Sequence, residues 1–277
     1  MRDPIIFDTW EEFLAQPPSS GKPHPVYRGV ADEKWGLETT LERIGRVNEP
    51  FEEYLTAVAV VKDALESYTE KRWVLEQVDC LKIKPEDLWH FKGLPNYEFL
   101  VYLRHHGFPS PFLDWSMSRY VAAFFALIDA DPDKTERCAI YEFSACDEDG
   151  IRSFCGHKET PRICNLGHTI RAHKRHYMQQ AEYTYCVKAT DEAGLIFAPH
   201  SDGQGQYIKK YTLPTSERKK VLKSLQEMNI TAYTLFGTED SLIKMLTVDE
   251  YLIHNQRIPA SLIRSMFPPV AENGTEN

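Results

Sequence analysis

The densest group of chemically capable side chains in this sequence lies between residues 104 and 116. The segment reads Arg-His-His-Gly-Phe-Pro-Ser-Pro-Phe-Leu-Asp-Trp-Ser, and an apolar stretch over residues 120–128 follows it. Such a mixture between two apolar stretches is too polar, and too often interrupted by Gly and Pro, to serve packing alone. Histidine and aspartate together could perform acid–base chemistry or hold a metal ion. We therefore predict that this segment is the loop of a functional site.

Two helices are expected to hold this loop in place. Asn96 can cap a helix with apolar side chains on one face, and Gly107 can end that helix in a left-handed conformation. The two histidines would then lie in its last turn. Ser118 can cap a second helix over residues 119–128, whose dense apolar composition predicts burial on most sides.

Hydrophobic periodicity and turn residues predict the remaining elements. The expected helices are a short one that Thr9 caps and Pro17 ends, a long one from Phe51 through Leu65, one that Ser216 caps, and one over residues 242–253. The expected strands cover residues 26–30, 138–143, 183–187, 206–213 and 231–236. Together they indicate a single α+β domain over residues 22–255, with a helical lead-in at 1–21 and a partly disordered tail at 256–277.

Composition limits the functions open to this chain. Of its 277 residues, 42% are hydrophobic and 12% aromatic, which is enough for a sizeable core. The 32 basic and 41 acidic residues give a net charge of −9, which disfavours long-range binding to nucleic acid or anionic lipid. No apolar run approaches the roughly 20 residues that span a bilayer. With six irregularly spaced cysteines and no leader at the start, we expect a cytoplasmic protein with reduced thiols and no membrane partner.

Three further sequence features carry weaker signals. Potential metal ligands occur at Cys146, Cys155, His157, Cys164 and His168, but they lack the Cys-x-x-Cys spacing of a closed zinc module, so no metal is expected. Basic residues that could guide RNA or DNA occur at Lys209, Lys210, Arg218, Lys219 and Lys220, although a solvated face explains them more simply. The Gly-Gln-Gly at residues 203–205 lacks the helix that follows a dinucleotide fingerprint.

Several short motifs occur in the order seen in the FRG domain family. They are Tyr27-Arg28-Gly29, then Trp35 and Leu37, then His105-His106-Gly107, then Leu113-Asp114-Trp115-Ser116, then residues 122–126, and finally Leu235-Phe236. Over roughly residues 22–250 the chain therefore resembles FRG domains. It departs from their pattern at Arg104, where Gln is common, at Pro111, where Arg is common, and at Ala181, where Gly is usual.

The order of parts is also similar to that of ADP-ribosyltransferases of the Arg-Ser-Glu type. Those enzymes have an Arg on an early strand, a Ser-containing strand before a helix, and a Gln/Glu-x-Glu turn that opens a later strand. The corresponding residues here would be Arg28, Ser116 and Gln180-Ala181-Glu182. This resemblance implies an ADP-ribosyltransferase-like split sheet with inserted helices, and NAD as the cofactor.

The resemblance also implies a role for each matching residue. Arg28 would grip the pyrophosphate of NAD with its planar fork, and Gly29 beside it would let backbone or ligand approach closely. Glu182 would stabilise the positive charge that develops on the ribose, and Gln180 would position the acceptor. Ser116 would orient Glu182.

Four more residues complete the predicted site. Trp115 or Tyr27 would stack on a ring of the cofactor. His106 would face the site as an acid–base group, and Asp114 would contact the cofactor.

Each assignment has a structural alternative. Arg28 could form an ion pair, and Glu182 could be a solvated carboxylate at a strand end. Asp114 could brace the loop through backbone N–H groups, and Trp115 could be a core residue that fixes the loop. The histidines could simply hydrogen-bond the carbonyls that end their helix.

The expected function is mono-ADP-ribosylation of a macromolecule by a toxin or an anti-phage defence effector, with an antitoxin or regulatory protein as a further partner. The acidic composition favours a protein acceptor over nucleic acid. Two other classes stay open. A non-catalytic module that binds a nucleotide or a protein would keep Arg28 and Trp115 but be indifferent to Glu182. A hydrolase or nuclease would instead use His106 and Asp114, with or without a metal.

Overall fold

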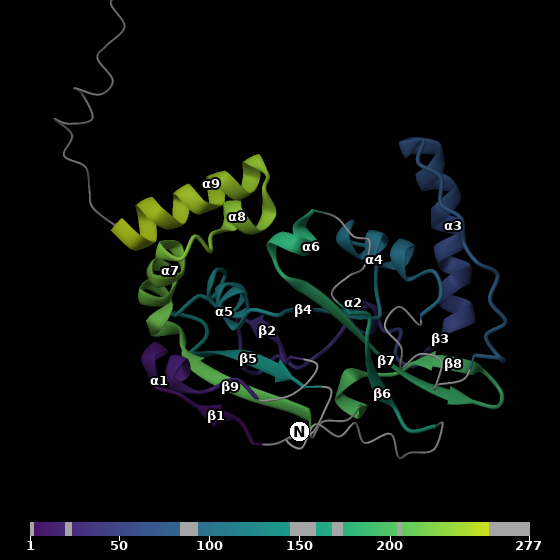
Figure 1. Cartoon of the computed structure of the whole chain (residues 1–277), viewed down its shortest axis with the longest axis horizontal. Coiled ribbons are helices and arrows are strands. Elements are labelled where there is room, and N and C mark those ends of the chain that lie inside the picture. The colour runs from purple at the N-terminus through teal and green to yellow at the C-terminus, as the bar shows by residue number, and fades with distance from the viewer. Residues whose placement is uncertain are drawn as a thin grey trace, which may run out of the picture.

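The computed structural model describes residues 3–19, 24–83, 94–144, 159–167, 174–203 and 207–254. Strands from these residues form one nine-stranded sheet, with helices packed against it (Figure 1). The strand order is β1-β9-β5-β2-β4-β7-β8-β3, and β6 pairs with β7. The fold is therefore α+β, as the sequence predicts.

The bounds of the elements are as follows. The strands are β1 (Ile5–Ile6), β2 (Val26–Val30), β3 (Glu49–Pro50), β4 (Phe112–Ser116), β5 (Arg137–Phe143), β6 (Arg162–Asn165), β7 (Ala181–Thr190), β8 (Gly194–Phe197) and β9 (Ile208–Pro214). The α-helices are α1 (Trp10–Ala15), α2 (Thr40–Arg43), α3 (Phe51–Thr69), α4 (Tyr97–His105), α5 (Arg119–Leu127), α6 (Arg175–Met178), α7 (Arg218–Glu227), α8 (Ala232–Phe236) and α9 (Glu239–Val248). Short 3₁₀ turns cover His200–Asp202 and Thr215–Glu217, and a π-helical turn, Asp249–His254, follows α9.

A single contact between β2 and β4 joins two halves of the sheet. These strands pair only where Tyr27 lies opposite Ser116. In contrast, β2 pairs with β5 along Val26–Val30, and β4 pairs with β7 along Phe112–Ser116. Beyond Tyr27, therefore, β2 and β4 no longer form a backbone ladder, and the sheet is split there.

Each half of the sheet has its own helical cover on the same face (Figure 1). Helices α3 and α4 pack against β4, β7 and β8, with Tyr54 and Leu100 in that core. Helices α1, α5 and α7 pack against β5 and β9, with Phe124 and Leu225 in a second core. A third cluster, around Trp115, fills the opposite face. Full burial of one such apolar side chain stabilises the folded chain by about 1.5–3 kcal/mol. Each cluster therefore stabilises the packing of the sheet face on which it lies.

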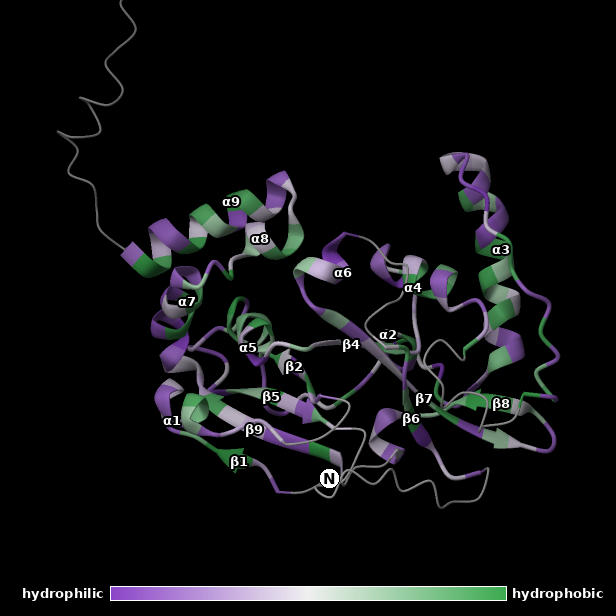
Figure 2. Cartoon of the chain, in the orientation of Figure 1, coloured by the Kyte–Doolittle hydropathy of each residue, from purple (hydrophilic) through white to green (hydrophobic). Residues whose placement is uncertain are grey.

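Helix α3 shows how hydrophobic patterning places a helix on the sheet. Figure 2 shows hydrophobic and hydrophilic residues mixed along it. The apolar side chains of Phe51, Tyr54 and Val58 recur three or four residues apart and are buried. Such spacing places them on one face of the helix, so that face packs against the sheet while the other meets water.

Local sequence signals determine several helix ends. Thr9 caps α1 and Ser118 caps α5, each by accepting a hydrogen bond from a backbone amide, as predicted. Gly107 follows α4 with a φ of 86°, also as predicted. Asn96 occupies the N-cap position of α4, but its side chain exchanges hydrogen bonds with the backbone of Glu76 and does not cap the helix.

Other elements differ from the prediction. Residues 231–236, expected as a strand, form α8, because Thr231 and Thr234 make a capping box and Gly237 ends the helix with a φ of 64°. Ser216, expected as a cap, lies inside a 3₁₀ turn, and α7 begins after that turn. Strands β1, β3, β6 and β8 are not predicted, because two to four residues are too few to show alternation.

The N-terminal segment shares the core of the rest of the chain. Strand β1 pairs in parallel with β9, and Phe13 of α1 packs edge-on against Tyr211. The expected lead-in is thus integrated into the sheet, whereas residues 256–277 lie outside the described residues. Within the described ranges, no helix is both long enough and apolar enough to cross a membrane.

The basic residues near positions 209–220 take part in the fold. Lys209 donates to Ser19, Lys210 to the Glu33 carbonyl, Arg218 to the carbonyls of Leu127 and Ile128, and Lys220 to Glu11 and Glu217. Arg218 thereby satisfies carbonyl groups at the end of α5. These contacts explain the basic stripe as structural.

Candidate functional site

A cavity of about 610 Å³ opens at the split between β2 and β4. Its walls come from β2, β4 and β7, and from helices α2, α4, α5, α6 and α8. Sites for small molecules usually occupy about 300–1,000 Å³, so this cavity is large enough for a nucleotide. Its charged lining residues are Arg28, Arg43, Arg104, Arg175, Asp114 and Asp129. Arginine outnumbers carboxylate among them, which suits an anionic ligand.

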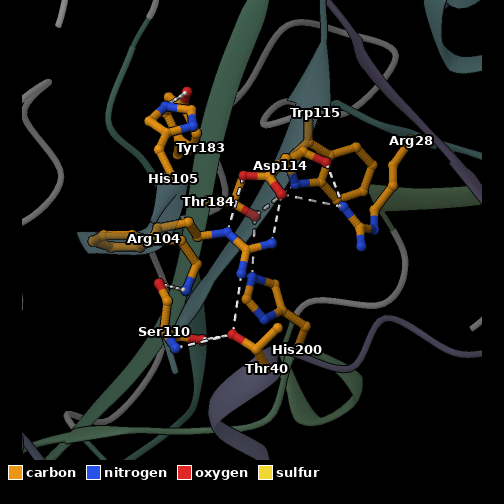
Figure 3. Close-up of polar contacts among 11 residues, drawn as sticks. Arg28, Thr40, Arg104, His105, Ser110, Asp114, Trp115, Tyr183, Thr184 and His200 are labelled. Atoms are coloured by element: carbon orange, nitrogen blue, oxygen red, sulfur yellow. Dashed lines mark hydrogen bonds and ion pairs between the residues drawn. The ribbon is translucent and has the colours of Figure 1, made fainter. Parts of the chain in front are cut away.

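Asp114 lies between Arg104 and Arg28 (Figure 3). Arg104 donates to both carboxylate oxygens, with Nε–Oδ1 at 3.0 Å and Nη2–Oδ2 at 2.5 Å. Arg28 donates from Nη1 to the backbone carbonyl of Asp114 at 2.7 Å and lies 4.0 Å from Oδ2. Asp114 thus braces the loop, as the structural alternative holds, but through arginines and not through backbone N–H groups. Its side chain keeps 43% of its surface accessible.

Burial and charge act in opposite directions on these three groups. Burial raises the pKa of Asp114, but Arg104 and Arg28 lower it more, so the pKa ends below its ordinary value. Burial lowers the pKa of Arg28 to about 10, although Asp114 raises it. Burial also lowers the pKa of Arg104, but Asp114 raises it above its ordinary value. All three groups are therefore charged at neutral pH, and the trio has a net positive charge.

A hydrogen-bond chain holds Arg104 in place. Its Nη1 donates to the Thr40 hydroxyl at 3.1 Å, and the Ser110 amide donates to the same hydroxyl at 2.9 Å. Tyr54 of α3 donates to the Pro109 carbonyl at 3.0 Å. The loop predicted to form a site is therefore tied to α2 and α3. Arg104 belongs to the segment predicted to form a site, but the sequence pattern does not predict its pairing with Asp114.

The two histidines have different surroundings. His105 lines the cavity, and its Nε2 is 2.9 Å from the Tyr183 hydroxyl. His106 is exposed, and its ring centroid lies 4.4 Å from that of Tyr102. The prediction that His106 faces the site is wrong. Helical spacing does not distinguish the two, because His105 lies four residues after the buried Val101 and His106 lies three residues after the buried Leu103.

The Gln-Ala-Glu turn is not arranged as predicted. Gln180 is exposed, with a φ of 48°, and Gln179 lines the cavity instead. Glu182 lies between Ala181 and Tyr183, which both line the cavity, and strand alternation turns its side chain to the other face of β7. There Asn165 donates a hydrogen bond to the Glu182 carboxylate. The structure therefore does not bring Glu182 together with Arg28.

Ser116 and Gly29 line the cavity but have clear packing roles. The Ser116 hydroxyl donates to the Gln179 carbonyl at 2.7 Å and accepts from a backbone amide just before α5 at 3.0 Å. It thus orients the turn before β7 and not Glu182. A Cβ on Gly29 would lie 1.9 Å from the carbonyl oxygen of Ala122. The close approach of helix α5, and not of a ligand, therefore requires glycine at this position.

Tyr27 and Trp115 are buried residues at the cavity wall, so neither exposes a ring face for stacking. Trp115 Nε1 donates to the Thr184 hydroxyl at 2.7 Å, and that hydroxyl lies 3.0 Å from His200 Nε2 (Figure 3). Burial lowers the pKa of His200 to about 3, so its imidazole is neutral. Trp115 is thus a core residue, as the structural alternative holds, but it lies in strand β4 and not in the loop predicted over residues 104–116.

The possible metal ligands fall mostly outside the described residues. Cys146, Cys155, His157 and His168 lie in undescribed segments, and Cys164 is a buried free thiol. Among the residues that the structure describes, no three potential ligands gather in one place.

Comparison with known proteins gives a match to one family model. No curated protein and no solved structure matches the chain. A family model for the FRG domain matches residues 23–135. The matched range includes Arg28, Arg104, His105 and Asp114, which form much of the polar wall of the cavity. The chain therefore contains a segment, residues 23–135, that is similar to the FRG domain.

Proposed function

We propose that the cavity binds NAD, or a nucleotide that shares its pyrophosphate, and that the protein transfers the ADP-ribosyl group to a macromolecule. The observation that carries this proposal is the gathering of Arg28, Arg43, Arg104 and Arg175 around one cavity. A pyrophosphate presents adjacent negative oxygens, and planar guanidinium groups bind such oxygens in pairs. A cavity with several arginines therefore favours a phosphorylated ligand over a neutral one.

Arg28 fits the role of a phosphate-binding residue. Its Nη1 is fixed by the carbonyl of Asp114, which sets the orientation of the whole planar group. Its Nε is buried and has no hydrogen-bond partner among the described residues. An unmade hydrogen bond of this kind costs about 1–3 kcal/mol, so a polar ligand near this group would be stabilising.

The split of the sheet supports the more specific fold proposal, an ADP-ribosyltransferase-like split sheet. Arg28 lies on one edge of the split and Asp114 on the other, and Ser116 lies opposite Tyr27 at the contact that joins the two edges. This matches the order of parts expected from the resemblance. NAD, when bound, supplies an ADP-ribosyl group whose bond to nicotinamide breaks with positive charge on the ribose. Asp114 is the carboxylate that we assign to stabilising this charge, because it is accessible in the cavity and Glu182 is not.

A second candidate, a non-catalytic nucleotide-binding module, is favoured by the pairing of the cavity carboxylates. Asp114 is neutralised by Arg104, and Asp129 pairs with Lys244 at 2.7 Å. A carboxylate that is already paired stabilises a developing charge less well. The hydrolase alternative would now have to use His105 with Asp114, because His106 lies outside the cavity lining.

The biological part of the proposal rests on the resemblance and on composition. A net charge of −9 disfavours a polyanionic acceptor, so we propose a protein acceptor. A toxin or anti-phage defence effector acting in the cytoplasm, with an antitoxin or regulatory partner, is the role that we propose.

One experiment separates catalysis from binding. Purified wild type, Asp114→Asn and Glu182→Gln are each incubated with adenylate-labelled NAD and a cell lysate, and nicotinamide release and label transfer are measured. We expect turnover in wild type, a loss of about tenfold or more in Asp114→Asn, and a change within about twofold in Glu182→Gln. A thermal melt of each variant checks that it folds. NAD binding without turnover supports the binding module, and no NAD binding by calorimetry refutes the proposal.

A further inference from the structure

Trp35 is an aromatic side chain that the fold leaves open at the cavity. It lines the cavity and is 54% exposed, whereas Tyr27 and Trp115 in the same lining are buried. Tryptophan offers a large apolar face, and leaving that face in water forgoes the stabilisation that burial would give. An exposed tryptophan in a concave, charged site is therefore suited to contact with a ligand.

The turn that carries Trp35 is fixed by strand β5 and by β9. The Tyr141 hydroxyl donates to the Trp35 carbonyl at 2.7 Å. The Glu33 amide donates to the Arg137 carbonyl at 2.9 Å, and Lys210 donates to the Glu33 carbonyl at 2.5 Å. Because the backbone is already held, little further order is lost when a ligand packs on the indole.

Tyr141 lies beside both Arg28 and the backbone of Trp35. Arg28 of β2 lies opposite Tyr141 of β5 in the antiparallel register, so their side chains are neighbours on one face of the sheet. The Tyr141 hydroxyl in turn contacts the backbone of Trp35. Trp35 and Arg28 thus belong to one wall of the cavity. A single ligand could contact Trp35 with a flat ring and Arg28 with a phosphate.

We propose that Trp35 is the platform on which the base of a nucleoside diphosphate stacks while its phosphates lie against Arg28. The phosphate part rests on the proposed function, and the base subsite is new. Every nucleobase has a π-face and can stack on an aromatic side chain, whichever polar groups the base carries. The expected gain over a ligand without a base is about tenfold in affinity.

The test compares a ligand that has a base with one that lacks it. ADP and inorganic pyrophosphate are titrated by calorimetry against wild type, Trp35→Ala and Trp35→Phe. Tyr68→Ala is the matched control, since Tyr68 is 89% exposed and lies outside the cavity lining. We expect Trp35→Ala to weaken ADP binding about tenfold and leave pyrophosphate binding unchanged. Trp35→Phe, which keeps a ring, and Tyr68→Ala should both bind ADP nearly as wild type does.

The outcomes distinguish the platform from the proposed function. If Trp35→Ala binds ADP as tightly as wild type and both bind pyrophosphate, the base lies elsewhere, and the platform is overturned while the phosphate site stands. If wild type binds neither ligand, both proposals fall. Quenching of tryptophan fluorescence by ADP in wild type, and its loss in Trp35→Phe, would support the platform.

Discussion

At the floor of the cavity, Arg104 and Asp114 neutralise each other through two nearly parallel hydrogen bonds of 3.0 and 2.5 Å. Arg28 donates to a backbone carbonyl, so its positive charge is only partly balanced by the carboxylate 4.0 Å away. Hydrogen bonds to charged groups contribute about 1.5–3 kcal/mol each when well made. The pair therefore fixes the wall, while Arg28 supplies the charge available to a ligand.

At the same scale, His200 should give the protein a specific pH dependence. Its pKa is lowered from 6.5 to about 3 in the folded chain. At pH values above 6.5 it is neutral in both states and contributes no pH dependence. As the pH falls from 6.5 towards 3, His200 is protonated in the unfolded chain but stays neutral in the folded chain. The free energy of unfolding therefore falls by about 1.4 kcal/mol per pH unit.

Urea unfolding at about pH 7 and about pH 5 measures this effect. The free energy of unfolding of wild type relative to His200→Gln should fall as the pH is lowered. The comparison is internal, because every other titratable group is present in both proteins. A difference that stays constant between the two pH values would contradict the lowered pKa of His200 in the folded chain.

The resemblance to known families predicts part of the site. Arg28, Asp114 and Ser116 were all expected near a ligand, and the structure places them in one cavity. Helical spacing does not decide between His105 and His106, because each lies three or four residues after a buried residue of α4. The Gln-x-Glu motif does not place Glu182 at the cavity, because strand alternation turns its side chain to the face opposite that of Tyr183.

At the scale of elements, the contact between β2 and α5 positions Arg28 against the cavity. Gly29 adjoins Arg28, and its Cα packs on the backbone of α5 at Ala122. A side chain here would push the helix from the strand. We therefore expect Gly29→Ala to lower the free energy of unfolding by about 3 kcal/mol or more, measured by denaturant titration.

Gly36→Ala is the matched control for this prediction. A Cβ at Gly36 would meet nothing within 4 Å, so its stability should stay within about 0.5 kcal/mol of wild type. If Gly29→Ala were as stable as Gly36→Ala, the close packing of β2 on α5 would be wrong.

Elements with strong local signals were predicted well. The caps Thr9 and Ser118 and the stop at Gly107 are read directly from residue types. A run as short as residues 231–236 shows no clear period, so the prediction of a strand there is wrong. The Thr231–Thr234 capping box and Gly237 favour a helix. The short strands β1 and β3 exist only because a partner strand lies beside them.

At the scale of the whole molecule, the cavity depends on contacts far apart in sequence. Its lining runs from Tyr27 to Phe236 and draws on both halves of the sheet. No local pattern specifies that β2 and β4 pair at one position and then part, so the cavity could not be predicted from sequence. The same geometry concentrates arginines inside a chain whose net charge is −9. Ligand binding should therefore weaken with added salt, as attraction between exposed charges does.

The measurement that tests the central claim most directly is calorimetric titration of NAD into wild type, Arg43→Ala and Arg46→Ala. The two arginines are matched, since they are 52% and 57% exposed and each pairs with a glutamate at 3.5 Å. Only Arg43 lines the cavity. We expect Arg43→Ala to weaken NAD binding about tenfold and Arg46→Ala to change it less than about twofold. Equal affinity of the two variants, or no binding of NAD to wild type, would contradict a nucleotide site in this cavity.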